Sequence, residues 1–221
     1  MKESETSVRR KIVIVGGGFG GIRCALDLVK HVPVGTRVQL ISNKKYFEYY
    51  AALYRVVTGD EPADVYIPLS DIFSGTFVEV LHDTVTSIDI EKKIVFGQSG
   101  AHYQADYIVL ALGSETSYFN IKGLKEQSFG FKTTNEAIRL KRHIDTLFKK
   151  HRYSAPEEQL LAFHFVIIGA GASGVELAGE LEFYTRQRAK CYNINKSLIS
   201  IDLIAFCTMA ISSAFGTRRP R

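Results

Sequence analysis

Lys11-Ile-Val-Ile-Val-Gly-Gly-Gly-Phe-Gly-Gly21 is the stretch of sequence that decides the fold. Lys11–Val15 is a short β-branched run, which predicts a strand buried on both faces, as in a parallel sheet. Gly16–Gly21 follows with the spacing GxGxxG, and apolar residues then recur at helical spacing from about Phe19 to Lys30. The stretch therefore predicts a strand, a tight glycine turn and a helix, in that order.

The glycines of this turn each have a physical reason. Gly16 makes the tight turn from strand to helix, Gly18 lets a diphosphate approach the backbone, and Gly21 lets the helix pack closely on the strand. The helix start offers free N–H groups and a positive dipole end to phosphates. The alternative is a turn that needs glycine only for its backbone angles. The candidate dinucleotide-binding residues are Gly16, Gly17, Gly18, Phe19, Gly20 and Gly21.

A second strand is predicted at Arg37–Ile41, which completes a βαβ unit of about 30 residues. An acidic residue commonly ends this strand and binds a ribose hydroxyl. Ser42 and Asn43 stand there instead, and Glu48 is a more distant candidate. We expect Ser42 and Asn43 to bind the ribose of a dinucleotide by hydrogen bonds that carry no charge.

The middle of the chain changes in character. Residues 43–75 are rich in aromatic side chains and show no regular period, so they are expected to be irregular. Short strands follow in close succession, which indicates a small antiparallel meander inserted in a doubly wound domain. These strands are expected at about 77–81, 84–90, 93–97 and 106–112.

A helix is predicted from Thr133 to about Arg152, because its apolar residues share one helical face. Thr133 and Glu136 have the spacing of a capping box, in which each side chain binds the other residue's N–H. The stretch Ser154–Glu158 is expected to be a loop or hinge.

A second strand, glycine turn and helix begin at Phe163–Ile168. Gly169-Ala-Gly-Ala-Ser-Gly174 repeats the spacing GxGxxG, so Gly169, Gly171, Ser173 and Gly174 are candidates for a second dinucleotide. A turn without a ligand is again the alternative. The strand Ser200–Ile204 is followed by neither an acid nor an arginine, so the sequence does not distinguish NADH from NADPH there.

The composition excludes several classes of protein. Of the 221 residues, 46% are hydrophobic and 23% are charged, which is ordinary for a globular protein. The chain has 28 Lys and Arg against 23 Asp and Glu, but the basic residues are scattered in pairs such as Lys44-Lys45. They form no block interleaved with aromatic residues, so no nucleic-acid partner is expected. No secretory signal or spanning segment is evident, and the chain is expected in the cytoplasm or against a membrane face.

Cysteine and histidine residues predict neither a metal nor a dithiol site. Cys24, Cys191 and Cys207 are too far apart for a disulfide framework, a zinc site or the CxxC pair that many flavin reductases use. His164 precedes a buried strand and is expected to be a packed strand-end residue. No metal ligand is therefore assigned.

Three further stretches give a resemblance to a known family. They are Tyr107-Ile-Val-Leu-Ala-Leu-Gly-Ser-Glu-Thr116, Val166–Leu181 and Tyr46–Gly59, although Ala51 stands where the family has a proline. With the first glycine turn, they make roughly residues 10–204 resemble the type II NADH dehydrogenases. These are FAD-containing members of the pyridine-nucleotide oxidoreductase superfamily.

The resemblance implies an enzyme that accepts hydride from NADH on FAD and passes two electrons to a quinone. FAD would bind the first glycine turn, with Ala111 and Gly113 closing over the flavin, and NADH would bind the second. Glu176 matches the functional glutamate of the family and is the candidate catalytic residue. The alternative for Glu176 is a carboxylate that merely complements the helix dipole.

The expected fold is α/β, with two doubly wound Rossmann-like dinucleotide-binding units. The first, residues 9–125, binds FAD and carries the inserted antiparallel β-meander. The second, residues 126–204, is a partial NAD(H)-binding unit, and residues 205–221 form a divergent basic tail. Family members are nearly twice as long, so we expect a truncated gene product whose second sheet cannot cover both of its faces.

Several alternatives stay open from the sequence. The chain could be a reductase of the same superfamily that uses another electron acceptor, such as a ferredoxin reductase or an apoptosis-inducing-factor-like oxidoreductase. The chain could also be a binding module or redox sensor that holds a dinucleotide without turnover. Membrane contact is expected only through segments of the full-length relatives, and a homodimer is left open.

Overall fold

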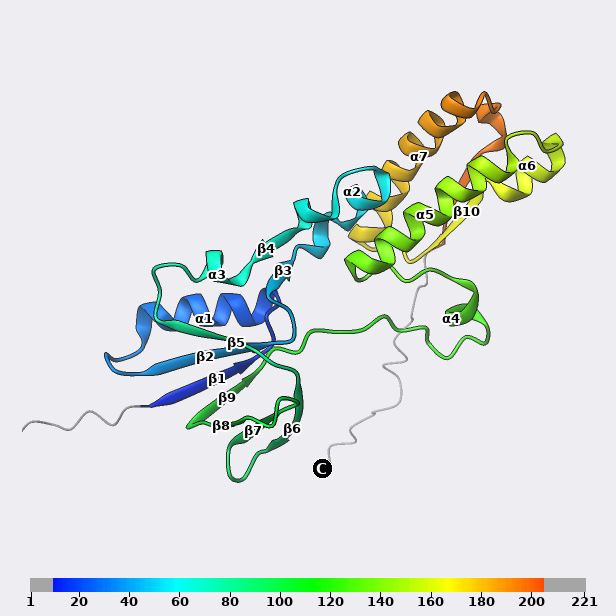
Figure 1. Ribbon diagram of the computed structural model, residues 1–221. Coiled ribbons are helices and arrows are strands. Elements are labelled where there is room, and N and C mark those ends of the chain that lie inside the picture. The colour runs from blue at the N-terminus through cyan, green and yellow to red at the C-terminus, as the bar shows by residue number, and fades with distance from the viewer. Residues whose placement is uncertain (1–9, 205–221) are drawn as a thin grey trace, which may run out of the picture. The chain divides into compact units, whose positions relative to one another are not determined.

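The computed structural model describes residues 10–204, so residue 9 and the tail predicted at 205–221 lie outside the described residues. The chain divides into two compact units, shown in Figure 1. The first runs up to Val56 and from Asp60 to Ile138, and the second comprises Val57–Gly59 and the chain from Arg139 onward. The boundary expected at residues 125 and 126 stays a prediction.

A parallel sheet with the strand order β5-β2-β1-β9 is the centre of the first unit (Figure 1). Within β1, Val13 and Ile14 are fully buried, which confirms the predicted strand with two covered faces. Ile14 lies opposite Leu40 on one neighbour and Val109 on the other. The strands are β1 (Lys11–Val15), β2 (Arg37–Ser42), β5 (Val78–His82) and β9 (Tyr107–Leu110).

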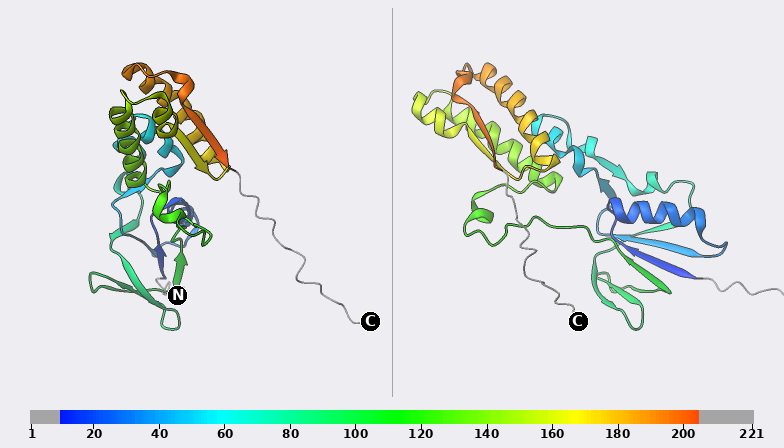
Figure 2. Two further views of the ribbon diagram at one scale, coloured as in Figure 1. Left: turned by 90° about the vertical axis from the view of Figure 1, so that its right-hand side faces the viewer. Right: turned by 180° about the vertical axis from the view of Figure 1, so that it is seen from behind.

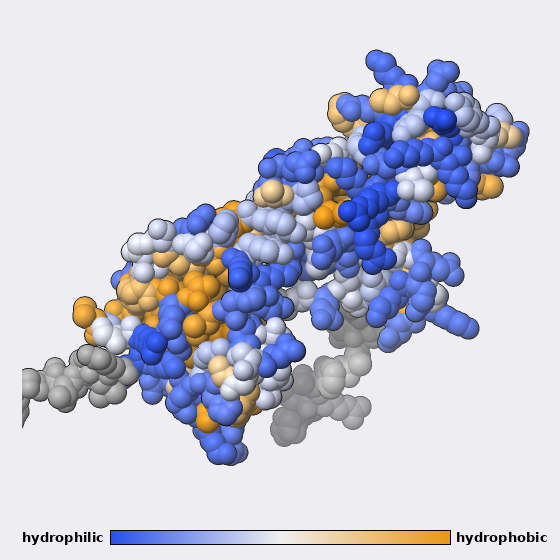
Figure 3. Space-filling model, in the orientation of Figure 1, coloured by the Kyte–Doolittle hydropathy of each residue, from blue (hydrophilic) through white to orange (hydrophobic). Residues whose placement is uncertain are grey.

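Helix α1 (Phe19–His31) covers one face of this sheet and confirms the helix predicted after the glycine turn. Side chains alternate between faces along a strand, so Ile14 and Leu40 point to the helix, where they meet Ile22 and Ala25. Figure 3 shows apolar side chains gathered over α1 and α3 (Leu69–Ile72). The partly buried residues at this margin include Leu26, Val29 and Ile72.

An antiparallel sheet of β6 (Val85–Asp89), β7 (Ile94–Gly97) and β8 (His102–Gln104) covers the other face. Figure 2 shows it on the side of the parallel sheet opposite α1. Val95 packs there in a cluster with Val13. The strands expected at 77–81 and 106–112 are β5 and β9, and they belong to the parallel sheet. The three-residue β8 was not expected, because His-Tyr-Gln shows no apolar alternation.

Asp83 ties the meander to the parallel sheet. Its carboxylate accepts hydrogen bonds from the Ser99 hydroxyl at 2.6 Å, the Tyr103 hydroxyl at 2.7 Å and the Thr84 N–H at 2.8 Å. These donors, the Ser99 hydroxyl foremost, lower the pKa of Asp83 to about 2. A Cβ at Gly97 would lie 1.8 Å from the same carboxylate, so the network also requires glycine at that position.

This network predicts an acid-sensitive contribution to stability. An aspartate in an unfolded chain has a pKa of about 3.9, so the contribution is fully present above that pH and is lost as the pH falls from about 4 to about 2. Asp83→Asn is expected to lower the urea midpoint near neutral pH, and the difference from the wild type should shrink toward pH 2. Urea unfolding across that range measures it. If the urea midpoints of the wild type and Asp83→Asn differed by the same amount at every pH, the ionised Asp83 carboxylate could not be the source of this stability.

The segment expected to be irregular between residues 43 and 75 contains short regular elements. Strands β3 and β4 pair antiparallel, with Phe47 opposite Ile67. Each element is too short to show a period in the sequence, which explains why it was missed. Besides α3, they are β3 (Tyr46–Glu48), η1 (Tyr50–Ala52), α2 (Leu53–Thr58), η2 (Pro62–Val65) and β4 (Tyr66–Pro68).

The two units are joined along the chain by α5. The predicted capping box is confirmed at its start: Thr133 N–H donates to Glu136 Oε2 at 2.9 Å, and Glu136 N–H donates to Thr133 Oγ1 at 3.3 Å. A short helix precedes it in the first unit. These helices are α4 (Leu124–Gln127) and α5 (Thr134–His151).

In the second unit, β10 pairs in parallel with β11. The loop expected at Ser154–Glu158 is wrong in part, because a helix begins at Pro156. Proline at the first position and Glu157 and Glu158 in the first turn are themselves signals of a helix start. The elements are α6 (Pro156–Ala162), β10 (His164–Ile168), α7 (Ala172–Tyr192), η3 (Lys196–Leu198) and β11 (Ser200–Ile204).

Aromatic and polar contacts hold the helices of the second unit. The rings of Phe148 on α5 and Phe163 stack at 4.5 Å and are fully buried. On α7, the Tyr184 hydroxyl donates to Asp145 at 2.8 Å, and Arg188 pairs with the same carboxylate at 2.7 Å. Across residues 10–204, no helix has both the length and the apolar character needed to cross a bilayer.

Candidate functional site

The first glycine turn follows the carboxyl end of β1, where the chain bends under tight steric limits. Gly16 has φ of +117°, and its N–H donates to the Ile41 carbonyl at 2.8 Å. A Cβ at Gly16 would lie 2.1 Å from the carbonyl oxygen of Ala111. Only glycine adopts this positive φ readily and also leaves room for the Ala111 carbonyl.

The other glycines of the turn differ in what surrounds them. A Cβ at Gly21 would lie 1.9 Å from the Gly16 carbonyl oxygen, and one at Gly17 would lie 2.6 Å from Ser42 Oγ. A Cβ at Gly18 would meet no atom within 4 Å. Packing therefore requires glycine at Gly16, Gly17 and Gly21, whereas no contact within residues 10–204 explains the glycine at position 18.

The open space at Gly18 adjoins the start of α1. Gly18 is the N-cap residue and has no side chain that could accept a hydrogen bond from the first N–H groups of the helix. The first turn also contains no acidic residue. The free N–H groups and the positive end of the helix dipole are thus directed to a site that an anion can enter. A dinucleotide diphosphate matches this arrangement.

Ser42 and Asn43 lie at the carboxyl end of β2, beside this turn. Ser42 is buried, and its hydroxyl oxygen accepts the N–H of Lys44 at 3.1 Å. Asn43 is exposed, and its backbone carbonyl oxygen lies 3.2 Å from His82 Nε2. This contact does not use the side-chain amide of Asn43. Glu48 forms an ion pair with Lys44, so its carboxylate is already engaged.

Ala111 and Gly113 follow β9 at the same edge of the sheet. Ala111 N–H donates to the Val15 carbonyl at 2.8 Å, which places Ala111 directly against Gly16. Gly113 is exposed and has φ of +78°. The structure therefore brings Ala111 to the predicted glycine turn, and Gly113 lies two residues farther along the exposed chain.

Four aromatic side chains stand beside the turn, and we call them the aromatic wall: Phe19, Phe47, Tyr49 and Tyr50. The Phe19 ring lies 4.7 Å from Phe47, 4.9 Å from Tyr50 and 5.8 Å from Tyr49, measured between ring centroids. Phe19 was a candidate from its place in the motif, but the other three were not. The density of aromatic residues between 46 and 54 was the available signal.

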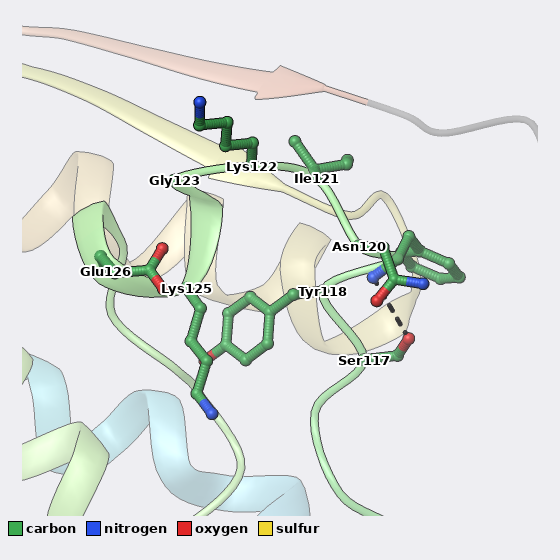
Figure 4. Close-up of a pocket in the computed structure, with 9 residues that line it drawn as sticks. Ser117, Tyr118, Asn120, Ile121, Lys122, Gly123, Lys125 and Glu126 are labelled. Carbon is green, nitrogen blue, oxygen red and sulfur yellow. Dashed lines mark hydrogen bonds between the residues drawn. The ribbon is translucent and has the colours of Figure 1, made fainter.

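A shallow hollow is lined by one continuous segment, residues 117–126, which includes the start of α4, and it contains none of the predicted site residues (Figure 4). Phe119 N–H donates to Ser117 Oγ at 3.4 Å, and Phe119 and Asn120 both have positive φ. The segment surrounds the hollow with its own backbone, Lys122 and Lys125. Among the described residues, none outside this segment lines the hollow, so we assign it no ligand.

The second glycine turn repeats the first. Gly169 has φ of +119°, and its N–H donates to the Ile204 carbonyl at 2.9 Å. A Cβ at Gly174 would lie 1.9 Å from the Gly169 carbonyl oxygen, while one at Gly171 would meet no atom within 4 Å. Gly171 is the N-cap of α7 and, like Gly18, has no side-chain cap.

One contact of the first turn is absent from the second. A Cβ at Gly169 would meet no atom within 4 Å, although a Cβ at Gly16 would strike Ala111. The difference arises because β1 has a neighbour on each side, whereas among the described residues β10 pairs with β11 alone. Val166 and Ile168 on β10 are correspondingly 48% and 45% exposed.

Glu176 and Ser173 are both exposed on α7. The first turn of α7 contains no acidic residue, so Glu176 lies beyond it. A charge interacts with the helix dipole mainly within the first turn, which weakens the alternative of a mere dipole complement. The catalytic assignment of Glu176 stays a prediction.

His164 was expected to be a packed strand-end residue; it is the first residue of β10, but the expected packing was wrong. Its side chain is 43% exposed, and Nε2 lies 2.8 Å from Oδ2 of Asp202 on the neighbouring strand. The pairing of β10 with β11 placed a carboxylate beside it, which local sequence does not show. Within residues 10–204, no three His, Cys, Asp or Glu side chains are grouped as metal ligands.

Comparison with known proteins identifies the family of this chain. Residues 10–199 match the family described as pyridine nucleotide-disulphide oxidoreductase. The type II NADH:quinone oxidoreductase Ndh of Mycobacterium tuberculosis is 31% identical over 179 residues, which cover 78% of this chain and 38% of that protein. The demethylphylloquinone reductase NdbB of Synechocystis is 31% identical over 186 residues, which cover 80% and 44%.

The fold is also found in a solved structure. The structure of NDH2 from Plasmodium falciparum in complex with NADH superposes with a TM-score of 0.75 at 22% identity, covering 88% of this chain and 41% of that one. The chain thus spans about two fifths of the length of these relatives. With its α/β fold, its two glycine turns and a family match over most of its length, the chain belongs to the pyridine nucleotide-disulphide oxidoreductase family.

Proposed function

We propose that this chain forms the FAD-binding part and a portion of the NADH-binding part of an oxidoreductase that passes electrons from NADH to a quinone. One observation carries the proposal. Gly18 and Gly171 each face space that is open among the described residues, at the uncapped start of a helix. By contrast, packing or backbone angle requires glycine at Gly16, Gly17, Gly21, Gly169 and Gly174. Two sites of the same geometry match an enzyme that uses two dinucleotides.

FAD is assigned to the first turn and NADH to the second. The assignment rests on the order of the two turns in the resembling family and on the relatives, two of which are named for quinone reduction. Bound FAD supplies the hydride acceptance and electron transfer that side chains do not provide. The residues of this chain bind and orient the cofactors, and the proposed domains are 9–125 and 126–204.

The first site binds a dinucleotide without an acidic ribose ligand. Ser42 retains its hydroxyl proton as a donor, and Asn43 has an uncommitted amide, so either can bind a ribose hydroxyl. Ala111 lies against Gly16, and Gly113 follows it along the chain, so both can line the site beside the glycine turn. In the second site, Ser173 and Glu176 are exposed beside the helix start and free to contact a ligand.

A second candidate function is a non-catalytic dinucleotide-binding module. It is favoured by the exposed apolar residues Val166, Ile168, Leu203 and Ile204 on β10 and β11. A doubly wound parallel sheet is normally covered on both faces, so the second site is less enclosed than the first. A quinone acceptor, contact with a membrane and a homodimer belong to the proposal for the whole protein.

The absorbance spectrum of the purified chain before and after anaerobic NADH addition tests the proposal. We expect a bound flavin whose visible bands bleach on addition of NADH and return on addition of a quinone. Bound flavin that NADH does not bleach would favour the binding module. Bleached flavin that ferredoxin, but not quinone, reoxidises would indicate the other class of reductase. Protein without flavin, even after incubation with FAD, would contradict both functions.

A further inference from the structure

Lys132 is held in an unusual position for a surface lysine. Its Nζ lies over the ring of Tyr50, 4.7 Å from the centroid. Its own N–H donates to Glu136 Oε2 at 2.8 Å, so its backbone is bound to the capping box of α5. Within residues 10–204, no carboxylate lies at ion-pairing distance from its ammonium group. The Tyr50 ring is thus the partner that fixes the side chain.

Tyr50 in turn belongs to the aromatic wall. Its ring meets Phe19 edge to face, with centroids 4.9 Å apart. Phe19 is the first residue of α1, directly after the open position at Gly18. A continuous series of contacts therefore runs from Glu136 through Lys132 and Tyr50 to the helix start that faces the proposed diphosphate.

We propose that Lys132 and Tyr50 are positioning residues for the first dinucleotide site, acting as a clamp between the aromatic wall and the first turn of α5. The inference rests on the proposed function and deepens it. Tyr50 and Phe19 are each 41% exposed, so packing alone leaves their rings partly unconfined. The cation over the outer face of Tyr50 restricts that ring, which keeps Phe19 and the start of α1 in the binding geometry.

Variants of Lys132 test the clamp through cofactor affinity. Lys132→Met keeps an unbranched stem and removes the charge, and we expect it to weaken FAD binding by about three- to tenfold. Lys132→Arg keeps a cation over the ring and should restore the affinity to within about twofold. The dissociation constant of FAD is measured by flavin fluorescence with the full chain, and circular dichroism checks the fold.

The chain offers a matched control. Lys93 Nζ lies over the ring of Tyr107 at 5.8 Å, so it is another lysine and tyrosine contact in the same unit. Lys93 is on the meander side and is not part of the aromatic wall. Lys93→Met should leave FAD affinity unchanged. Equal affinity of the wild type and Lys132→Met, or equal losses in Lys132→Met and Lys93→Met, would overturn the clamp.

A double-mutant cycle tests whether Lys132 acts through Tyr50. Tyr50→Leu removes the ring, so adding Lys132→Met to it should cause less than about a twofold further loss of FAD affinity. Additive losses would overturn the clamp, because they would mean that Lys132 acts without the ring. A wild-type chain that binds no FAD would instead contradict the proposed function itself.

Amide hydrogen exchange gives a readout that is independent of the affinity. Because the clamp ends at the capping box, FAD should slow exchange at residues 134–137 of α5 in the wild type and in Lys132→Arg. At saturating FAD, this protection should be absent from Lys132→Met. Equal protection in the wild type and Lys132→Met would overturn the proposed link to α5.

Discussion

Gly18→Ala is expected to weaken FAD binding by about 10- to 100-fold, because hydrogen bonds to a charged group contribute about 1.5–3 kcal/mol each. The added Cβ would project into space where the described part of the chain has no atom within 4 Å, which is where we place the diphosphate. The phosphate oxygens would be pushed from the N–H groups at the start of α1. The loss is specific to the ligand, since no protein contact is disturbed.

The fold should tolerate this substitution. Gly18 has φ of −91° and ψ of −169°, which are extended values that alanine also adopts. Alanine is a poorer N-cap than glycine, so a loss of stability below about 1 kcal/mol is expected. Fluorescence titration with FAD and urea unfolding measure the two quantities separately.

Gly20→Ala is the matched control for Gly18→Ala. It adds the same methyl group two residues later, where the Cβ would make only an ordinary contact of 3.9 Å with Ala111. Gly20 was a candidate binding residue from its place in the turn, but it is not one of the three spaced glycines of GxGxxG, and alanine there would disturb no close contact. FAD affinity should therefore be retained in this variant. If Gly18→Ala bound FAD as tightly as Gly20→Ala and the wild type, the diphosphate could not lie at Gly18, and the proposed site would have to be abandoned.

The glycine turns could be predicted from sequence because their geometry is local. Gly16 and Gly21 are five residues apart, and the contact that requires glycine at position 21 lies within the same turn. The capping box of Thr133 and Glu136 was predictable for the same reason, since both of its hydrogen bonds span three residues. When the interacting residues are only three to five positions apart, their spacing in the sequence is enough to predict the contact.

Pairing between distant strands could not be predicted in the same way. The strands that became β5 and β9 have the apolar character expected of meander strands, yet they pair with β2 and β1 in the parallel sheet. His164 met a carboxylate only because β11 lies beside β10. These outcomes depend on which strands become neighbours, and that information is not contained in the period of a single segment.

Contacts of the aromatic wall, within the candidate site, also could not be predicted from the sequence. Phe19 was found from the motif, but Tyr50 and Lys132 come from segments 31 and 113 residues farther along the chain. Neither belongs to a motif with a fixed spacing. The sequence therefore predicted the backbone of the glycine turn, whereas the contacts that join Tyr50 and Lys132 to Phe19 were visible only once the fold had brought these residues together.

Gly21→Ala is expected to destabilise the first unit by about 2–4 kcal/mol, within the range for overpacking combined with a backbone shift. Its Cβ would lie 1.9 Å from the Gly16 carbonyl oxygen, which is far closer than any tolerated contact. The start of α1 would have to move by at least about 1 Å from β1 to restore a 3.0 Å separation. Ile22, which is buried against Ile14, would move with it.

Unlike Gly18→Ala, this substitution should reduce stability and FAD affinity together, because it displaces the helix start at which we place the phosphates. Urea unfolding followed by circular dichroism measures the loss of stability. Gly179→Ala on α7 is the control, since its Cβ would meet no atom within 4 Å, and alanine in a helix interior should raise stability by up to about 1 kcal/mol. A Gly21→Ala variant as stable as the wild type would mean that α1 and β1 are not packed as described. The contrast between Gly21, where packing requires glycine, and Gly18, where we propose that the ligand requires it, would then be lost.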